Sequence, residues 1–223
     1  DLDELQRCAT DLEVRGAGSK VGVSHCDLLD RATFAPALDA AALLLEAHQL
    51  APQVIDWRRA LHQKPEVAFQ EHETARFIRQ ILEQIGGLEI SRPTETSVMA
   101  RLRSGHAGPV IAVRADIDAL PIQEENDVAY RSQSEGAMHA CGHDVHITSL
   151  VGTARVLTQL KNRWSGTIVF IGQPAEERGA GARAMLKDGL FTRFPKPDYC
   201  LALHVSSDMA AGSVGVVEGF VLA

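Results

Sequence analysis

Three short apolar runs, each followed by polar side chains, constrain the fold of this chain more than any other feature. They lie at residues 110–113, 167–171 and 199–203. Because apolar residues occupy successive positions, both faces of each predicted strand are expected to be buried, as in the middle of a parallel sheet. Helical patterns fill the intervals, at residues 144–160 and near residues 180–187. This alternation predicts an α/β fold of three layers, with one sheet flanked by helices.

The part of the chain before these runs divides in two. From residue 53 onward the pattern is clear and predicts two helices and two short strands, at residues 53–64, 73–85, 88–91 and 97–102. The beginning of the chain differs, since it offers only two modest helical stretches around a glycine turn, at residues 2–14, 37–50 and 16–19. We therefore expect an extra amino-terminal helical segment of unknown role at residues 1–50 and a main domain at residues 51–223.

Charge and composition exclude two classes of partner. The 223 residues contain 22 basic and 29 acidic side chains, which gives a formal net charge of −7. A nucleic-acid partner requires a basic surface, so we predict none. The longest nearly apolar stretch, residues 37–45, is interrupted by Asp39 and is far shorter than the roughly 20 residues of a membrane helix, so no membrane partner is expected. An apolar content of 45% predicts a folded, soluble protein.

The cysteines and the first residue bear on the compartment. Cys8, Cys26, Cys141 and Cys200 are too widely and irregularly spaced for a disulfide framework. Reduced thiols are therefore favoured, and with them a cytoplasmic location. The chain begins with Asp1 instead of methionine, and no signal-peptide pattern precedes the body. A processed form or a fragment is expected, and export of a processed form stays open.

Side chains capable of chemistry follow each predicted buried strand. The three strand ends contribute two aspartates, two glutamates and a histidine, namely Asp116, Asp118, Glu176, Glu177 and His204. A further segment, residues 138–146, precedes the long helix and contains Cys141 and His143. Since ligands of open α/β sheets bind at the carboxyl ends of the strands, we expect these groups to meet at one edge.

Each of these residues also has an ordinary structural interpretation. Cys141 alone is more often a small buried apolar residue, and Glu176 with Glu177 is usually a solvated acidic pair. His204 alone would be a hydrogen-bonded core histidine. Together, a thiolate, two imidazoles and a carboxylate match the mixed ligand set of Zn²⁺ and similar ions. The leading hypothesis is therefore a divalent metal site with four ligands, Cys141, His143, Glu177 and His204.

The residues beside these ligands receive supporting interpretations. Glu176 adjoins a predicted ligand and is placed to hold and deprotonate a water molecule, as in other metal-assisted hydrolases. Asp116 could orient a ligating imidazole without binding the ion itself. His146 is expected to face the helix interior or solvent, and His139 has a structural interpretation. The remaining histidines show no clustering that requires a function, and they are His25, His48, His62, His72 and His106.

Five motifs, in an order found in one family, give the sequence a specific resemblance. They are W-R-R-A-L-H with P-E at residues 57–62 and 65–66, R-A-D-I-D-A-L-P at 114–121, M-H-A-C-G-H-D at 138–144, Q-P-A-E-E at 173–177 and L-H-V at 203–205. Together they resemble the zinc-peptidase-like amidohydrolases, which include hippurate hydrolase, aminoacylases and indole-acetyl-amino-acid hydrolases. The resemblance covers about residue 53 to the end. It implies that residues 51–223 are the amino-terminal part of a zinc-exopeptidase-like catalytic domain.

The resemblance also implies a reaction. It assigns the same four ligands and makes Glu176 the general base, with one or two divalent ions drawn from Zn²⁺, Mn²⁺, Co²⁺ or Ni²⁺. It implies hydrolysis of the amide bond of small-molecule N-acyl amino acids or peptides. A dipeptidase of the same superfamily is the nearest alternative activity.

The length departs from that family. Relatives are nearly twice as long, because a lid and dimerisation domain follows the region of His204, and a last histidine ligand comes later still. We therefore expect a fold truncated before the lid, through which family members often form homo-oligomers. Little or no activity is expected from these 223 residues alone. A catalytically silent fragment that binds metal, or that only assembles with another chain, stays an alternative from a different functional class.

Overall fold

The computed structural model of this protein describes residues 40–215. They fall into two compact units, and the larger one, residues 49–205, contains the sheet and every predicted site residue. The smaller unit includes residues 40–48 and 206–215. None of the described helices is long and apolar enough to span a bilayer. Several predictions lie outside the described residues, namely the helix at 2–14, the turn at 16–19, Cys8, Cys26 and His25.

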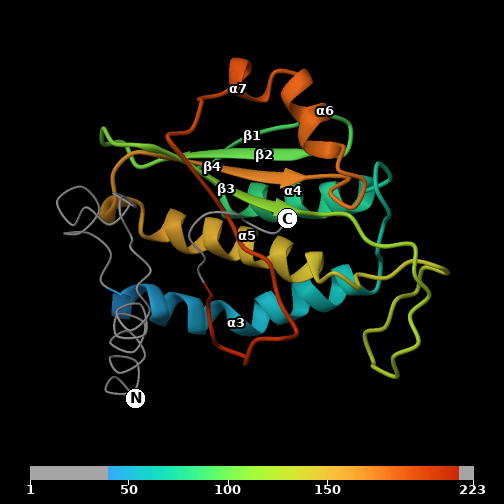
Figure 1. The fold of residues 1–223 in the computed structure, drawn as a ribbon. Helices are drawn as coiled ribbons and strands as arrows, with labels where there is room; N and C mark the ends of the chain where they lie inside the picture. Colours follow the sequence, from blue (N-terminus) through green and yellow to red (C-terminus); the bar gives the residue numbers. More distant parts are fainter. Residues whose placement is uncertain (1–39, 216–223) are drawn as a thin grey trace. The chain divides into compact units, whose positions relative to one another are not determined.

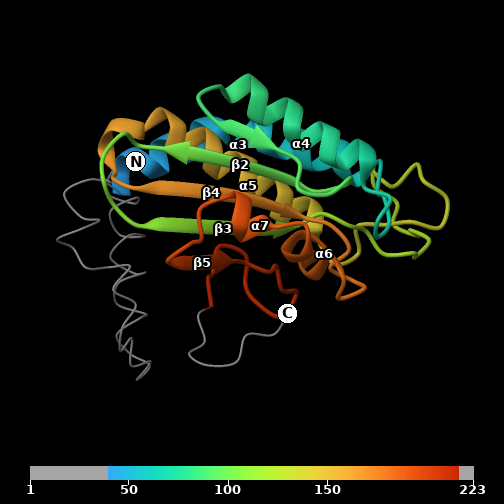
Figure 2. The same cartoon turned by 90° about the horizontal axis from the view of Figure 1, so that it is seen from above.

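A five-stranded mixed sheet forms the centre of the larger unit (Figure 2). In spatial order its strands are β1 (Glu89–Ser91), β2 (Val98–Arg103), β4 (Thr167–Gln173), β3 (Val110–Asp116) and β5 (Tyr199–Ala202). Strand β3 is parallel to both β4 and β5, whereas β2 is antiparallel to β4 and to β1. The three parallel strands are the three apolar runs of the sequence, so their carboxyl ends lie along the same edge.

Helices cover both faces of this sheet (Figure 1). They are α4 (His72–Ile85), α5 (His143–Gln159), the 3-10 turn η2 (Lys161–Arg163), α6 (Gly181–Lys187) and α7 (Leu190–Arg193). On one face, apolar residues of α4 and α5 pack against the sheet in the main core. On the other face, Met185 of α6 and Leu190 of α7 pack against Met99 and Val169. The predicted α/β fold, a sheet flanked by helices, is confirmed.

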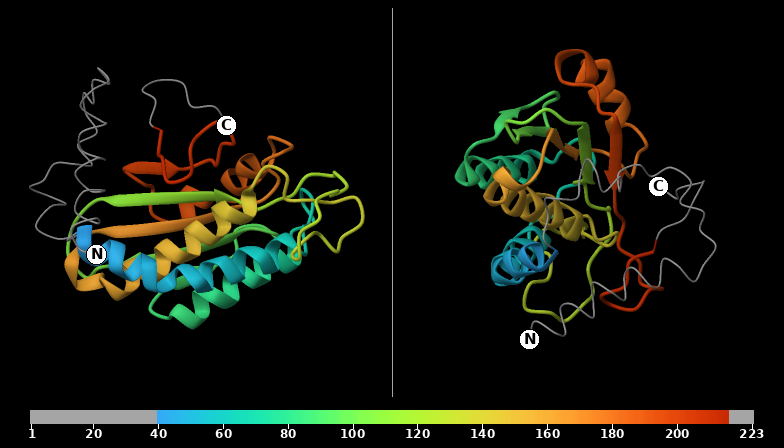
Figure 3. Two further views of the ribbon diagram at one scale, coloured as in Figure 1. Left: turned by 90° about the horizontal axis from the view of Figure 1, so that it is seen from below. Right: turned by 90° about the vertical axis from the view of Figure 1, so that its left-hand side faces the viewer.

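A single helix stands where the sequence predicts two. Helix α3 spans Ala40–His62 without interruption, and Pro52 lies inside it. Helices α3 and α5 lie side by side in Figure 3. Because α3 is continuous, Leu50 and Val54 both lie against Gly152 of α5. Proline removes one backbone donor from a helix, and α3 continues through Pro52 despite that loss. The predicted break was therefore wrong.

The exposure of β5 also differs from the sequence-based prediction. All four of its residues are exposed, and Leu201 retains 46% of its accessible surface. The apolar run predicts a strand buried on both faces, whereas β5 is an edge strand that pairs only with β3 among the described residues. An apolar sequence allows a strand to be buried, but the strands and helices around it determine whether it is buried.

Candidate metal centre

The ends of three strands and the beginning of α5 bring the predicted site residues together. Three sets of ligand atoms each lie within 4.8 Å of one another: Cys141, His143 and His204; His143, Glu176 and Glu177; and Asp116, His143 and His146. His143 belongs to all three sets. The structure thus places every predicted ligand, the predicted base and Asp116 around one imidazole.

Gly142 makes the turn between Cys141 and His143. It adopts a left-handed conformation with φ of 84°, which glycine tolerates and other residues avoid. A Cβ at this position would collide with Cγ2 of Val205. The turn therefore leaves no room for a side chain, and it sets Cys141 and the first residue of α5 beside the segment that carries His204.

His143 has one ring nitrogen in use and one without a partner. Its side chain is completely buried, and Nδ1 donates to the carbonyl oxygen of Asp118 at 2.8 Å. This bond places the proton on Nδ1 and the lone pair on Nε2. Among the described residues, Nε2 has no hydrogen-bond partner. A buried imidazole lone pair surrounded by thiol and carboxylate groups is the arrangement that a divalent metal ion would satisfy.

Cys141 and His204 form a second pair of donors. The Sγ atom of Cys141 lies 3.3 Å from Nε2 of His204, while Nδ1 of His204 donates to the carbonyl oxygen of Val205 at 2.6 Å. Burial, followed by the neighbouring carboxylates of Glu177, Asp116 and Glu176, raises the pKa of the Cys141 thiol to about 12. A cation would reverse this effect, because it would replace the proton on sulfur.

Glu176 and Glu177 approach the free nitrogen of His143 from the end of β4. Glu176 Oε2 and Glu177 Oε1 each lie 3.8 Å from Nε2 of His143. Their side chains keep 21% and 22% of their surface accessible, so solvent reaches both. The backbone amide of Glu177 donates to Oδ2 of Asp118, so Asp118 fixes both this turn and the ring of His143.

Asp116 was expected to orient a ligating imidazole, but its hydrogen bond is with His146 and not with the predicted ligand His143. Nδ1 of His146 donates to Asp116 Oδ1 at 2.5 Å, whereas Asp116 Oδ2 lies 3.6 Å from Nε2 of His143. Arg114 also contacts Asp116 Oδ2, at 2.7 Å. Burial opposes ionisation of Asp116, but the hydrogen bond from His146 and the nearby positive charges hold its pKa at about 2.

His146 was expected to face the helix interior or solvent, and of these two alternatives the structure shows the interior. The side chain is buried against Asp116, and Nε2 accepts the backbone amide of Val205 at 3.0 Å. Both ring nitrogens are therefore in use. Its position three residues after His143 on α5 placed it beside the strand ends, and helical spacing was the signal that could have shown this.

A second buried cluster, which the sequence did not reveal, adjoins the first. His62 lies between two carboxylates, with Nδ1 2.8 Å from Asp144 Oδ2 and Nε2 3.2 Å from Glu124 Oε1. Arg58 Nε also lies 2.8 Å from Asp144 Oδ2. The hydrogen bond to Asp144 raises the pKa of His62 against the opposing effect of burial, and Glu124 adds to the increase. The sequence showed no clustering of His62 that requires a function, and the structure places His62 in a buried polar cluster next to the candidate site; Arg58 and His62 both lie in the first family motif.

His139 is buried between the two clusters. It is 4% exposed, and neither ring nitrogen has a hydrogen-bond partner among the described residues. Burial lowers the pKa of His139 to about 4, so the ring is neutral near pH 7. The structural interpretation of His139 stays a prediction.

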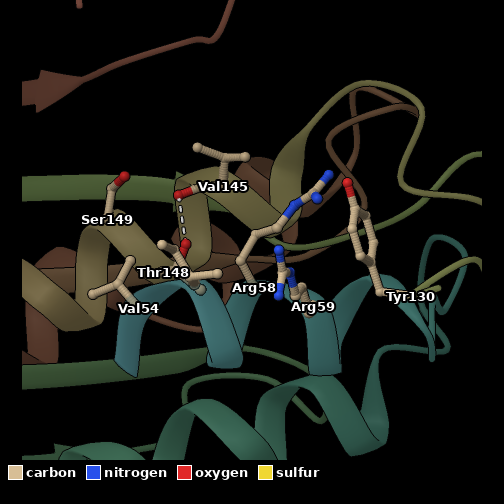
Figure 4. A pocket seen from close by; sticks show the side chains of 8 residues that line it. Val54, Arg58, Arg59, Tyr130, Val145, Thr148 and Ser149 are labelled. Atoms are coloured by element: carbon tan, nitrogen blue, oxygen red, sulfur yellow. Dashed lines mark hydrogen bonds between the residues drawn. The ribbon is translucent and has the colours of Figure 1, made fainter. Parts of the chain in front are cut away.

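An open groove lies beside the second cluster, on α3 and α5 (Figure 4). Its volume is about 360 Å³, and its lining includes Val54, Arg58, Arg59, Tyr130 and Val145. The guanidinium carbons of Arg58 and Arg59 lie 5.0 Å and 5.2 Å from the centre of the Tyr130 ring. None of the predicted metal ligands lines this groove.

An α/β sheet that gathers thiol, imidazole and carboxylate donors at its strand ends and at the start of α5 is the arrangement of a metal-binding α/β domain. Comparison with known proteins agrees with this class. Residues 112–219 match the profile described as Peptidase family M20/M25/M40. This region is therefore a peptidase M20 domain, and the resemblance to the zinc-peptidase-like amidohydrolases is confirmed.

Individual relatives match a longer part of the chain. An N-acyl-L-amino acid amidohydrolase of Geobacillus stearothermophilus is 47% identical over 171 residues, which are 76% of this chain and 45% of the relative. An IAA-amino acid hydrolase ILR1-like 6 of Arabidopsis thaliana is 41% identical over 77% of this chain and 37% of the relative.

A solved structure shows the same fold. The Bacillus subtilis YXEP protein, described as a dinuclear metal binding peptidase from the M20 family, superposes with a TM-score of 0.73 and 43% identity. The match covers 77% of this chain and 48% of that one. The chain thus covers less than half the length of each of these three relatives.

Proposed function

We propose that this chain carries the metal-binding residues of a hydrolase that cleaves the amide bond of N-acyl amino acids or small peptides. The observation that carries the proposal is Nε2 of His143, which is buried without a partner among the described residues and is surrounded by thiol, imidazole and carboxylate donors. The substrates named for the two relatives, an N-acyl-L-amino acid and an IAA-amino acid, support an amide of this class.

The donor set fits a divalent ion of borderline softness. One or two ions such as Zn²⁺, Mn²⁺, Co²⁺ or Ni²⁺ would be held by Cys141, His143, Glu177 and His204. Such an ion, when bound, polarises a carbonyl group and lowers the pKa of nearby water. Asp118 keeps Nε2 of His143 free for binding, because its carbonyl oxygen accepts the proton on Nδ1.

Glu176 would act as the general base. It adjoins the ligand Glu177, and its partly exposed carboxylate is accessible to water and substrate. Glu176 accepts a proton from the attacking water as the new C–O bond forms at the amide carbon. It then returns that proton to the departing nitrogen as the C–N bond breaks. The products are a carboxylic acid and a free amino acid.

The cysteines and the net charge support a compartment and argue against one class of partner. The irregular spacing of the four cysteines supports a reducing compartment such as the cytoplasm, and Cys141 and Cys200 form no disulfide bond among the described residues. The net charge of −7 argues against nucleic acid as a partner.

Metal binding and amide hydrolysis can be tested separately. The purified chain, treated with chelator and reloaded with Zn²⁺, Mn²⁺, Co²⁺ or Ni²⁺, should retain bound metal after dialysis. Because little turnover is expected from the 223 residues alone, release of amine from N-acetyl and N-benzoyl amino acids is followed over hours. Release that depends on metal and disappears in Glu176→Gln, which should keep its metal, supports the proposal. A wild-type chain that retains no metal contradicts it.

A further inference from the structure

The turn that carries Glu176 and Glu177 contains an unusual backbone conformation. Ala175, the residue before them, has φ of 48°, in the left-handed region that residues other than glycine rarely adopt. Such a conformation persists only where surrounding contacts impose it. Because the turn directs both carboxylates toward His143, the contacts that hold Ala175 also determine the geometry of the candidate metal centre.

Backbone contacts hold one side of this turn. The carbonyl oxygen of Ala175 accepts the amides of Ala180 and Gly181, each at 3.2 Å. A Cβ on Gly181 would collide with the carbonyl oxygen of Pro174, so the start of α6 lies directly against the turn. These contacts fix the carbonyl of Ala175 but leave its amide to be satisfied elsewhere.

A side chain from a distant segment binds that amide. The backbone N–H of Ala175 donates to Oε1 of Glu71 at 2.8 Å, across 104 positions of sequence. Both residues are completely buried, with 0% exposure. Burial raises the pKa of the Glu71 carboxyl, and the amide of Ala175 opposes this increase. The carboxyl oxygen can accept this hydrogen bond in either protonation state.

Glu71 does not serve the helix that it precedes. It occupies the N-cap position of α4, where a side chain commonly binds the first free amides of the helix, but it makes no such bond. Glu66 does this instead, since its two carboxylate oxygens accept the amides of Glu73 and Thr74 at 3.1 Å and 2.7 Å. The carboxylate of Glu71 is instead directed to the amide of Ala175, and hydrogen bonds from its own amide, the amide of Phe69 and the side chain of Thr96 also lower its pKa.

We infer that Glu71 is a positioning residue that holds the left-handed turn at Ala175 and thereby aims Glu176 and Glu177 at His143. A carboxyl group is costly to bury, and an apolar side chain would fill the same space without that cost. What the carboxyl adds is an acceptor for the Ala175 amide. This inference rests on the proposed function, because it gives Glu71 its role through the metal centre.

Two substitutions at position 71 distinguish the length of the side chain from its charge. Glu71→Gln keeps an acceptor oxygen at the same distance, whereas Glu71→Asp keeps the charge but is shorter by one carbon. Glu66→Ala is the matched control, since it removes a carboxylate that binds backbone amides at the same end of α4 but does not contact the turn. Co²⁺ is the probe, with affinity measured by titration and ligand geometry by the visible absorption spectrum of the loaded chain.

We expect Glu71→Asp to weaken Co²⁺ binding by roughly 10- to 100-fold and to change the spectrum, as is typical when a partner behind a metal ligand is lost. Glu71→Gln should bind within about threefold of wild type with the same spectrum, which is below the range of such effects. Glu66→Ala should lower the unfolding temperature without changing the spectrum. Wild-type affinity and spectrum in Glu71→Asp would overturn the inference, as would equal losses in Glu71→Gln and Glu71→Asp.

A second measurement does not depend on metal. Hydrogen exchange of the Ala175 amide, followed by NMR in the metal-free chain, should be slow in wild type and Glu71→Gln and faster in Glu71→Asp. Equal exchange in all three would overturn the role of Glu71 in holding the turn. Absence of Co²⁺ binding by wild type would contradict the proposed function, and the exchange measurement would still decide whether Glu71 holds Ala175.

Discussion

Two consecutive residues of α5, His143 and Asp144, belong to two different buried polar clusters. The clusters differ in how many of their polar groups have a partner. Asp144 belongs to the cluster with Arg58, His62 and Glu124, in which both nitrogens of His62 and the carboxylate of Asp144 have partners. His143 belongs to the candidate metal centre, where its Nε2 has no hydrogen-bond partner among the described residues.

The difference indicates what each cluster is built for. Buried charges are tolerated when each has a partner of opposite charge, and in the Asp144 cluster Arg58 and His62 both pair with Asp144, which links α3 to α5, although Arg58 Nε makes no hydrogen bond of good geometry among the described residues. A buried lone pair without a partner is costly, so the His143 cluster is complete only when a cation binds. Removing a residue from the first cluster should therefore affect folding, and removing one from the second should affect metal binding.

The largest expected effect is on metal affinity. Four-ligand zinc sites contribute roughly 10–16 kcal/mol, so Cys141→Ala combined with Glu177→Ala should weaken binding by about 1000-fold or more. Stability of the metal-free chain should change little, because both side chains are partly exposed. Metal content after dialysis and chemical unfolding of the metal-free chain measure the two effects. Unchanged metal content would refute the ligand assignment.

The next effect is on the stability of the paired cluster. Asp144→Ala leaves His62 and Arg58 without their shared partner, and breaking a buried ion pair in this way costs about 3–5 kcal/mol. Urea unfolding of the metal-free chain measures the loss. Asp188→Ala is the control, since Asp188 forms an exposed pair with Arg193 whose loss should cost at most about 1 kcal/mol. Equal losses in the two variants would remove the distinction between the clusters.

A smaller effect is expected from the turn between the two ligands. Gly142→Ala forces a left-handed conformation on alanine, at a cost on the order of 1–3 kcal/mol, and adds the collision with Val205. Gly136→Ala is the control, because Gly136 also has positive φ (69°) but has no atom near the position of a Cβ. Thermal unfolding should show a larger loss for Gly142→Ala, and metal affinity should fall only in that variant.

The smallest effect is a pH dependence within the paired cluster. Because the pKa of His62 is raised in the folded state, its contribution to stability is complete below the unfolded pKa of about 6.5 and is lost as pH rises through the folded value. Asp144, Glu124 and Arg58 are the charged groups that face it. The stability advantage of wild type over His62→Gln, measured by urea unfolding, should therefore shrink as pH rises above about 6.5. A constant difference would show that His62 does not change its charge in this range.

The candidate metal ligands could be predicted from the sequence, but the distant hydrogen-bond partners of the residues around them could not. His204 was found because it follows an apolar strand, where α/β folds bind ligands, and Cys141 and His143 because they lie two positions apart in the segment before the long helix. The partners of Asp144 and Ala175 could not be found in this way. His62 lies 82 positions from Asp144 and Glu71 lies 104 positions from Ala175, and local periodicity carries no information about such pairs.

The errors in the fold have a similar origin. The break predicted at Pro52 and the burial predicted for β5 both used local preference where packing between distant segments decides the outcome. By contrast, β4 has six of its seven residues buried, as its composition predicts, because it lies between two strands and two layers of helices.

Because β5 is exposed, the part of the candidate metal centre that contains His204 should open before the part that contains His143. His143 begins a buried helix, whereas His204 follows a strand whose outer backbone groups face away from the rest of the described sheet. Amides of β5 should therefore exchange with solvent through small local openings, and those of β4 only through global unfolding. An ion that joins His204 to His143 would connect the least protected strand to the most protected part of the unit. Metal binding should thus slow exchange in β5 far more than in β4.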